Sequence, residues 1–227
     1  MLTVEFGVSS NKTYISIGDC YQNIGRRNAL ALPFFHSFTG SDSTSYFFKK
    51  GKVALFRAWQ NFAFKETLTK VFIALSWHPS NALADKAFTI LQKFVISAYG
   101  GKQLEHGLND FRLQLFKKAS SNNLRELPPS QQGLNLHIKR SIYQSGWIWG
   151  NSITQRAIPP ATEFGWFNTG DNLAILWTLG SSGDLLKKIT KTCGCRSGPN
   201  KSCKSCVCGK ANLECLDQCK CQRSCCK

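Results

Sequence analysis

Residues 193–226 constrain the folding of this chain more than any other stretch, because they hold most of its cysteine. Ten of the eleven cysteines of the 227-residue chain lie there, and only Cys20 lies elsewhere. Three C-x-C pairs start thirteen residues apart, and each is followed by one distal cysteine. The segment is therefore a small internal repeat. Its cysteines are Cys193, Cys195, Cys203, Cys206, Cys208, Cys215, Cys219, Cys221, Cys225 and Cys226.

So dense a cysteine cluster indicates a disulfide framework or a metal cluster. The C-x-C pairs favour metal, because cysteines one residue apart rarely bridge each other, whereas both can ligate neighbouring zinc ions. The opening residues MLTVEFGVSS lack the pattern of a secretory signal, so we expect an intracellular location, nuclear rather than cytoplasmic. Nine thiolates that share about three Zn²⁺ ions fit the repeat better than two isolated four-ligand sites. A secreted disulfide knot is the alternative.

The spacing C-x-C-x7-C-x2-C-x-C-x6-C-x3-C-x-C-x3-C resembles that of the tesmin-type CXC domain, which also precedes the catalytic domain of Polycomb methyltransferases. The resemblance covers about one seventh of the chain. It implies that nine cysteines hold three zinc ions, with Cys226 spare or substituting for Cys225. DNA-reading members place a tyrosine before the second C-x-C, where this chain has Ser205. The resemblance thus implies a small irregular zinc module over residues 191–227, without sequence-specific DNA reading.

The net charge of +16 indicates an acidic partner such as nucleic acid. Residues 191–227 contribute +6 of this charge, and we predict phosphate contacts from Lys204 and Lys210 there. A solvated lysine-rich surface is the alternative. No run of about 18 apolar residues occurs, so we expect no membrane partner. No Walker, Rossmann or G-x-S-x-G motif occurs either.

Residues 1–190 predict a mainly α-helical domain with a short N-terminal β-hairpin over residues 2–17. An apolar fraction of 42% with sixteen Phe predicts a packed core. We expect Asp19 to cap a short helix, Pro33 to kink or divide the helix over residues 27–39, and Asn81 to cap the helix that ends at Gly100. In that last helix Leu83, Ala87, Leu91 and Phe94 recur at helical spacing and predict an apolar face. Residues 134–149 predict another helix and residues 158–170 a loop. Phe164, Trp166 and Phe167 are expected to pack onto the domain, the four histidines to be structural or superficial, and Cys20 to be buried.

The second unusual stretch is ALPFFHSFTGSDSTSYFFKKGK, residues 31–52. An aspartate in a Gly-Ser-Asp turn, here Asp42, can bind a divalent metal ion. A Gly-Lys pair at a helix start, with Lys49, Lys50 and Lys52 close together, suits phosphate. The alternatives are a helix cap for Asp42 and a solvated face for the lysines.

Together these residues resemble the end of a PIN-like or flap-endonuclease-like nuclease domain. More closely, residues 29–53 resemble a group of uncharacterised invertebrate proteins that share an H-x-x-T-G-C/S-D-x-x-S…G-K-G-K motif and for which a mobile-element origin is expected. Further matches at residues 127–130, 137–140, 143–144 and 165–166 extend the resemblance over nearly the whole chain.

Nucleases of this type gather several carboxylates around two Mg²⁺ or Mn²⁺ ions. Residues 1–50 contain only Glu5, Asp19 and Asp42 as acidic residues. We therefore expect this chain to be the C-terminal part of that architecture, with Asp42 a vestigial ligand. The favoured hypothesis is a nucleic-acid-associated zinc protein without complete catalytic machinery. A fragment of a divalent-metal nuclease and a zinc-stabilised protein–protein interaction module are the alternatives.

Overall fold

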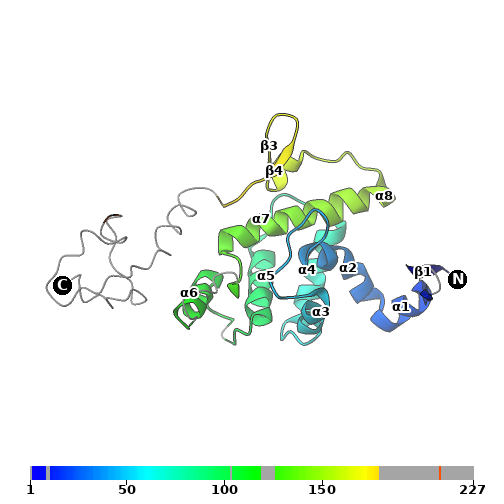
Figure 1. Cartoon of the computed structure of the whole chain (residues 1–227), viewed down its shortest axis with the longest axis horizontal. Helices are drawn as coiled ribbons and strands as arrows, with labels where there is room; N and C mark the ends of the chain where they lie inside the picture. Colours follow the sequence, from blue (N-terminus) through cyan, green and yellow to red (C-terminus); the bar gives the residue numbers. More distant parts are fainter. Residues whose placement is uncertain (1, 9–10, 103, 119–125, 179–209, 211–227) are drawn as a thin grey trace. The chain divides into compact units, whose positions relative to one another are not determined.

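The structure is a computed structural model that describes residues 2–8, 11–102, 104–118, 126–178 and 210. The described residues up to Trp177 belong to one compact unit. This unit is mainly helical and begins with an antiparallel β-hairpin, as predicted (Figure 1). Its elements are β1 (Thr3–Val8), β2 (Asn11–Ser16), α1 (Ile17–Ile24), α2 (Arg26–Phe38), α3 (Lys52–Gln60), α4 (Lys65–Trp77), α5 (Asp85–Ala98), α6 (Leu108–Lys118), α7 (Gln131–Ile142), a π-helix η2 (Tyr143–Trp149), α8 (Gly150–Thr154), a 3₁₀ helix η3 (Ala161–Phe164), β3 (Trp166–Asn168) and β4 (Leu173–Ile175).

The hairpin pairs β1 with β2 in a register that runs from Thr3 opposite Ser16 to Val8 opposite Asn11. The paired residues thus lie within the range 2–17 predicted for the hairpin. All six residues of β1 are exposed. The side chain of Ser16, rather than the predicted Asp19, caps α1, since its Oγ accepts from the Asp19 amide at 3.3 Å.

Helix α2 runs through Pro33 as one helix, so of the two predicted outcomes, a kink or a division, the division does not occur. Proline lacks an N–H group and disturbs the hydrogen bonds of the preceding turn. Two side chains of α4 form hydrogen bonds with main-chain groups of α2 on either side of Pro33. Ser76 Oγ accepts from the Phe34 amide at 3.0 Å, and the Trp77 indole donates to the Leu30 carbonyl at 2.9 Å. The α2–α4 contact therefore supplies hydrogen bonds around the proline, as well as apolar packing.

Aromatic side chains from α2, α3, α4 and α5 make the centre of the core. Phe34 stacks on Phe38 with ring centroids 5.5 Å apart. The ring centroid of Phe72 lies 5.5 Å from that of Phe34 and 5.2 Å from that of Trp59. Phe94 of α5 completes the cluster with its edge toward Phe72. Offset and edge-on ring contacts of this kind stabilise a core beyond the area they bury.

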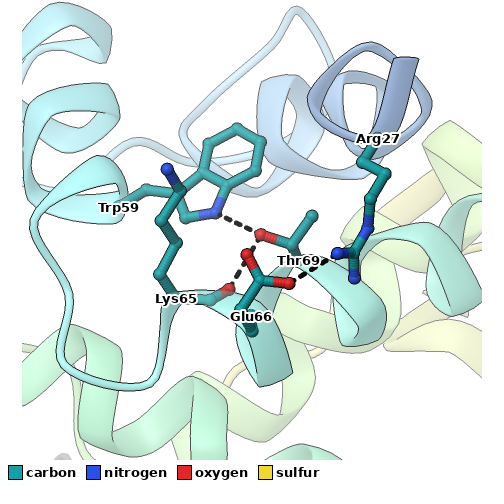
Figure 2. A network of polar contacts seen from close by, with 5 residues as sticks. All are labelled: Arg27, Trp59, Lys65, Glu66 and Thr69. Atoms are coloured by element: carbon teal, nitrogen blue, oxygen red, sulfur yellow. Dashed lines mark hydrogen bonds and ion pairs between the residues drawn. The ribbon is translucent and has the colours of Figure 1, made fainter. Parts of the chain in front are cut away.

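Figure 2 shows the polar contacts at the α3–α4 corner. The indole nitrogen of the fully buried Trp59 donates to Thr69 Oγ1 at 3.0 Å, and Thr69 donates to the Lys65 carbonyl at 2.8 Å. Arg27 of α2 pairs with Glu66 at 2.6 Å on the exposed side. A buried indole N–H needs a partner, so Thr69 fixes how α3 meets α4.

Helix α5 begins at Asp85, four residues after the predicted cap. Asn81 instead donates its side-chain amide to Glu163 at 2.7 Å. The predicted apolar face and the end of this helix are confirmed, because Leu91 and Phe94 are buried and Gly100 has the left-handed φ of 86°.

The predicted helix over residues 134–149 is α7 followed by the wider π-helix η2. Gly146 of η2 packs closely on the end of α4 and on Pro79 beyond it, because an added Cβ would lie 3.1 Å from the Leu75 carbonyl oxygen and 2.5 Å from Pro79 Cβ. Beyond η2, the predicted loop contains β3, which pairs with β4. Arg140 of α7 donates to the Gly165 and Leu176 carbonyls at 3.2 and 3.4 Å, and thereby attaches this second hairpin to α7.

The predicted packing of the aromatic residues near β3 is partly correct. Phe164 is buried, and the ring centroid of Trp166 lies 5.3 Å from that of Tyr143. Phe167, in contrast, is 43% exposed. Cys20 is half-buried on α1 rather than buried. Within the described ranges, no helix is both long enough and apolar enough to cross a membrane.

Candidate functional site

The segment between α2 and α3 forms a pocket of about 540 Å³. Every described residue that lines it belongs to residues 39–52, within the unusual stretch of the sequence. Lys49, Lys50, Lys52 and Asp42 all line it, so the structure brings together the predicted phosphate-binding lysines and the predicted metal ligand. By formal charge the described lining is positive, because it contains three lysines and one aspartate.

The carbonyl groups at the end of α2 are hydrogen-bonded by side chains from the residues after α2 and from α7. The last carbonyls of any helix lack partners within the helix. Lys52 Nζ donates to the His36 carbonyl at 2.8 Å, Thr44 Oγ1 donates to Ser37 at 2.6 Å, and His137 Nε2 contacts Phe38 at 2.8 Å. Together these three contacts form a side-chain cap, which fixes the segment to the helix end.

Lys52 is half-buried, and its ammonium group is bonded within this cap. Its ammonium group also donates to the Gly40 carbonyl and, at 3.1 Å, to Thr39 Oγ1. An ammonium group has three donors, and all three have protein acceptors here. Burial lowers the pKa of Lys52. The geometry therefore gives Lys52 a structural role that the sequence did not indicate.

The Gly-Ser-Asp sequence forms a tight turn closed by two hydrogen bonds of 3.2 Å between Ser41 and Thr44. Asp42 and Ser43 stand at its tip and are exposed. Ser43 Oγ donates to the side-chain oxygen of Gln144 in η2. Gly40 is required beside this turn, because it has a φ of 108° and an added Cβ would lie 2.7 Å from Tyr46 Cβ.

Asp42 lies close enough to His36 to affect its ionisation. Burial and the Lys52 ammonium group lower the pKa of His36, and the Asp42 carboxylate opposes that shift. Among the described residues, no group of three or more His, Cys, Asp or Glu side chains is arranged to hold a metal ion. Asp42 is thus placed as an exposed acceptor at the rim of a positive pocket.

Lys49 and Lys50 carry the charge that this pocket can offer to a ligand. Lys49 pairs with Glu126, and its side chain is 66% exposed. The Lys50 ammonium group lies 5.1 Å from the centre of the Tyr99 ring. Exposed ion pairs and cation–π contacts are weak and exchange readily, so both ammonium groups are able to turn toward an anion. Lys49 also has a left-handed φ of 57°, which places it in a turn conformation that favours glycine.

His137 was expected to be structural or superficial and is structural. It is 6% exposed, and burial lowers its pKa to about 4. A neutral imidazole whose Nε2–H donates to the Phe38 carbonyl fits this site. Its pairing with α2 was not visible in the sequence, since 99 residues separate the two partners.

A second pocket, of about 420 Å³, lies among the starts of α5, α6 and α7. Amide side chains dominate its described lining, and Asp85 is the charged residue there. It has no cation among those lining residues to attract phosphate, so the pocket over residues 39–52 is the better candidate for an anionic ligand.

The ten cysteines of the tail and Lys204 lie outside the described residues, and of the predicted site residues there only Lys210 is described, as exposed. No family model, curated protein or solved structure matches the chain.

Proposed function

We propose that this protein binds zinc through its C-terminal cysteines and associates with nucleic acid through phosphate contacts, without cutting it. The observation that carries the nucleic-acid part is the pocket over residues 39–52, where Lys49 and Lys50 are both available to an anion. The net charge of +16 supports the same class of partner. A nuclear location would follow from this function.

Phosphate suits this pocket for two physical reasons. The lysine ammonium groups supply charge, and α3 begins there at Lys52, behind the N-cap residue Gly51. The first amide groups of a helix point outward and favour anions. Contacts of this kind bind any sequence, because phosphates carry no base information. The site is therefore proposed to bind nucleic acid with little sequence preference.

The zinc part of the proposal is supported by the cysteine repeat of the tail. Three C-x-C pairs with one distal cysteine each supply nine thiolates, enough for three tetrahedral ions that share sulfurs. Lys204 and Lys210 lie between these cysteines and would add phosphate contacts. A CXC-type module over residues 191–227 is the proposed form of this region.

Two alternatives make different use of the same residues. In the nuclease alternative, Asp42 is one ligand of a divalent ion, but a two-metal site requires several carboxylates. In the protein-contact alternative, the zinc module binds another protein and the lysines form a solvated surface. A Lys49–Glu126 pair and a Lys50–Tyr99 contact that persist in solution would favour that reading.

The proposal is tested by the salt dependence of binding to a fluorescent oligonucleotide. We expect the affinity to fall steeply with salt, since each phosphate contact contributes about −0.7 to −0.9 to the slope of log K against log salt. The double substitution Lys49→Gly and Lys50→Gln should reduce that slope by about two. Glycine is chosen at residue 49 because it accepts the left-handed φ.

The matched control replaces Lys70 and Lys86, two exposed lysines of α4 and α5 outside the pocket, with glutamine. This control removes the same charge and should reduce the salt slope by less than the Lys49 and Lys50 substitutions do. A salt-independent affinity, or equal losses in the two double variants, would contradict the proposed site.

A further inference from the structure

We infer that the pocket over residues 39–52 accepts single-stranded nucleic acid, with an unpaired base stacked on Tyr46 and the adjoining phosphates held by Lys49 and Lys50. This inference rests on the proposed function and adds the substrate class. It begins from a tyrosine that the sequence analysis did not single out.

The Tyr46 side chain is 72% exposed although it lines the pocket. Another exposed tyrosine, Tyr14, donates its hydroxyl hydrogen to Glu5. Within the described part of the chain, neither a hydrogen bond nor a ring contact holds the Tyr46 side chain. Its other aromatic neighbour in the pocket, Phe47, is 5% exposed and belongs to the core.

The backbone of Tyr46 is fixed even though its ring is free. Its Cβ packs on Gly40, where any larger residue would collide with it. Gly40 and Ser41 are in turn held by the cap of α2, through Lys52 and Thr44. A ring on a rigid support loses little conformational freedom when a flat ligand stacks on it.

The positions of Lys49 and Lys50 complete the argument for a nucleotide. A nucleotide carries a flat apolar base on one side of its sugar and an anionic phosphate on the other. One short segment here lines a single pocket with a free aromatic ring and two exchangeable ammonium groups. Proteins that bind single strands combine these two elements, a cationic groove and an aromatic face for the bases.

A duplex does not suit the tyrosine in the same way. Paired bases are stacked on one another inside the helix and offer a side chain only their edges, whereas unpaired bases expose their faces. The Asp42 carboxylate at the pocket rim repels the phosphates of either form, so it does not distinguish them. The exposed ring of Tyr46 is therefore the feature that favours a single strand.

The experiment compares three ligands of equal length on the full chain: a mixed-sequence single-stranded oligodeoxynucleotide, an abasic strand with the same phosphates, and the corresponding duplex. We expect the intact strand to bind about 5- to 150-fold more tightly than the abasic strand, the effect expected for one stacked base. Tyr46→Ala should abolish that difference and leave abasic-strand binding unchanged. Tyr46→Phe should retain it, because the ring is kept.

Tyr21→Ala is the matched control, since Tyr21 is 49% exposed on α1 and does not line the pocket. An intact-strand preference that survives Tyr46→Ala, or a duplex that binds more tightly than the single strand, would overturn the inference while leaving nucleic-acid association in place. Failure of all three ligands to bind would instead overturn the proposed function.

Discussion

The ammonium group of Lys52 lies 2.8 Å from the main-chain oxygen of His36, at the end of α2. A cation at a helix C-terminus opposes the negative end of the helix dipole and satisfies a carbonyl that has no helical partner. The same group donates to the Gly40 carbonyl, so one side chain holds both the helix end and the Gly-Ser-Asp turn. The lysine cluster thus divides into one structural lysine and two that can contact a ligand.

We predict that Lys52→Met lowers the free energy of unfolding by about 1–3 kcal/mol, because the carbonyl groups that accept its charge-assisted hydrogen bonds lose their donor. In a protein of this size this corresponds to a loss of about 2–4 °C in Tm per kcal/mol. Lys50→Met is the control, and its Tm should be nearly that of the wild type. Should Lys52→Met keep the wild-type Tm and weaken oligonucleotide binding instead, Lys52 would be a phosphate ligand.

His137 makes the stability of the domain depend on pH. Burial lowers its pKa to about 4 from an ordinary value near 6.5. Above pH 6.5 the histidine is neutral in both folded and unfolded states, and between 6.5 and 4 only the unfolded state takes up the proton. Stability is therefore full above pH 6.5 and falls as the pH drops toward 4, by roughly 3 kcal/mol in total.

The test is urea unfolding of the wild type and His137→Gln at pH 7, 6, 5 and 4. Both proteins keep the same cysteines, so any loss of zinc in acid affects them alike. The wild type should lose more stability than the variant over this range. Parallel pH profiles for the two proteins would show that His137 is protonated at its ordinary pKa.

The Trp59–Thr69 hydrogen bond gives a prediction about the helical core. Thr69→Val keeps the volume of the side chain and leaves the buried indole N–H without an acceptor, which should cost about 1–3 kcal/mol. Trp59→Phe removes the donor, so Thr69→Val in that background should cost less. A double-mutant cycle by thermal unfolding measures the difference. Additive losses would mean that the hydrogen bond contributes nothing to stability.

The hydrophobic pattern was enough to predict the helical class, the first hairpin and the buried face of α5. It could not place the caps, because these depend on partners distant in sequence. His137 reaches Phe38 across 99 residues, and Ser76 serves the amide beside Pro33 from another helix. The π-helical geometry of η2, whose Gly146 packs on Pro79, was likewise not indicated by the sequence pattern. Composition marked residues 31–52 as unusual, but only the structure separates Lys52 from Lys49 and Lys50.

Asp42 separates the binding and nuclease alternatives. We expect no Mg²⁺- or Mn²⁺-dependent cleavage of DNA by the full chain, and a gain of up to about fivefold in affinity for Asp42→Ala, because the change removes the negative charge of the pocket. Gel-based cleavage and fluorescence anisotropy measure the two outcomes, with Asp85→Ala of the second pocket as the control. Metal-dependent cleavage that Asp42→Ala abolishes would establish the nuclease instead.

The cysteine repeat predicts a zinc content that can be counted. Nine thiolates around three ions should release about three equivalents of zinc from the purified protein when a thiol reagent modifies them. Cys20→Ser should not change this number, because Cys20 of α1 is not part of the cysteine repeat. Cys206→Ser with Cys208→Ser removes one C-x-C pair and should release fewer equivalents. One equivalent or none from the wild type would contradict a shared cluster, since three ions need every pair of the repeat.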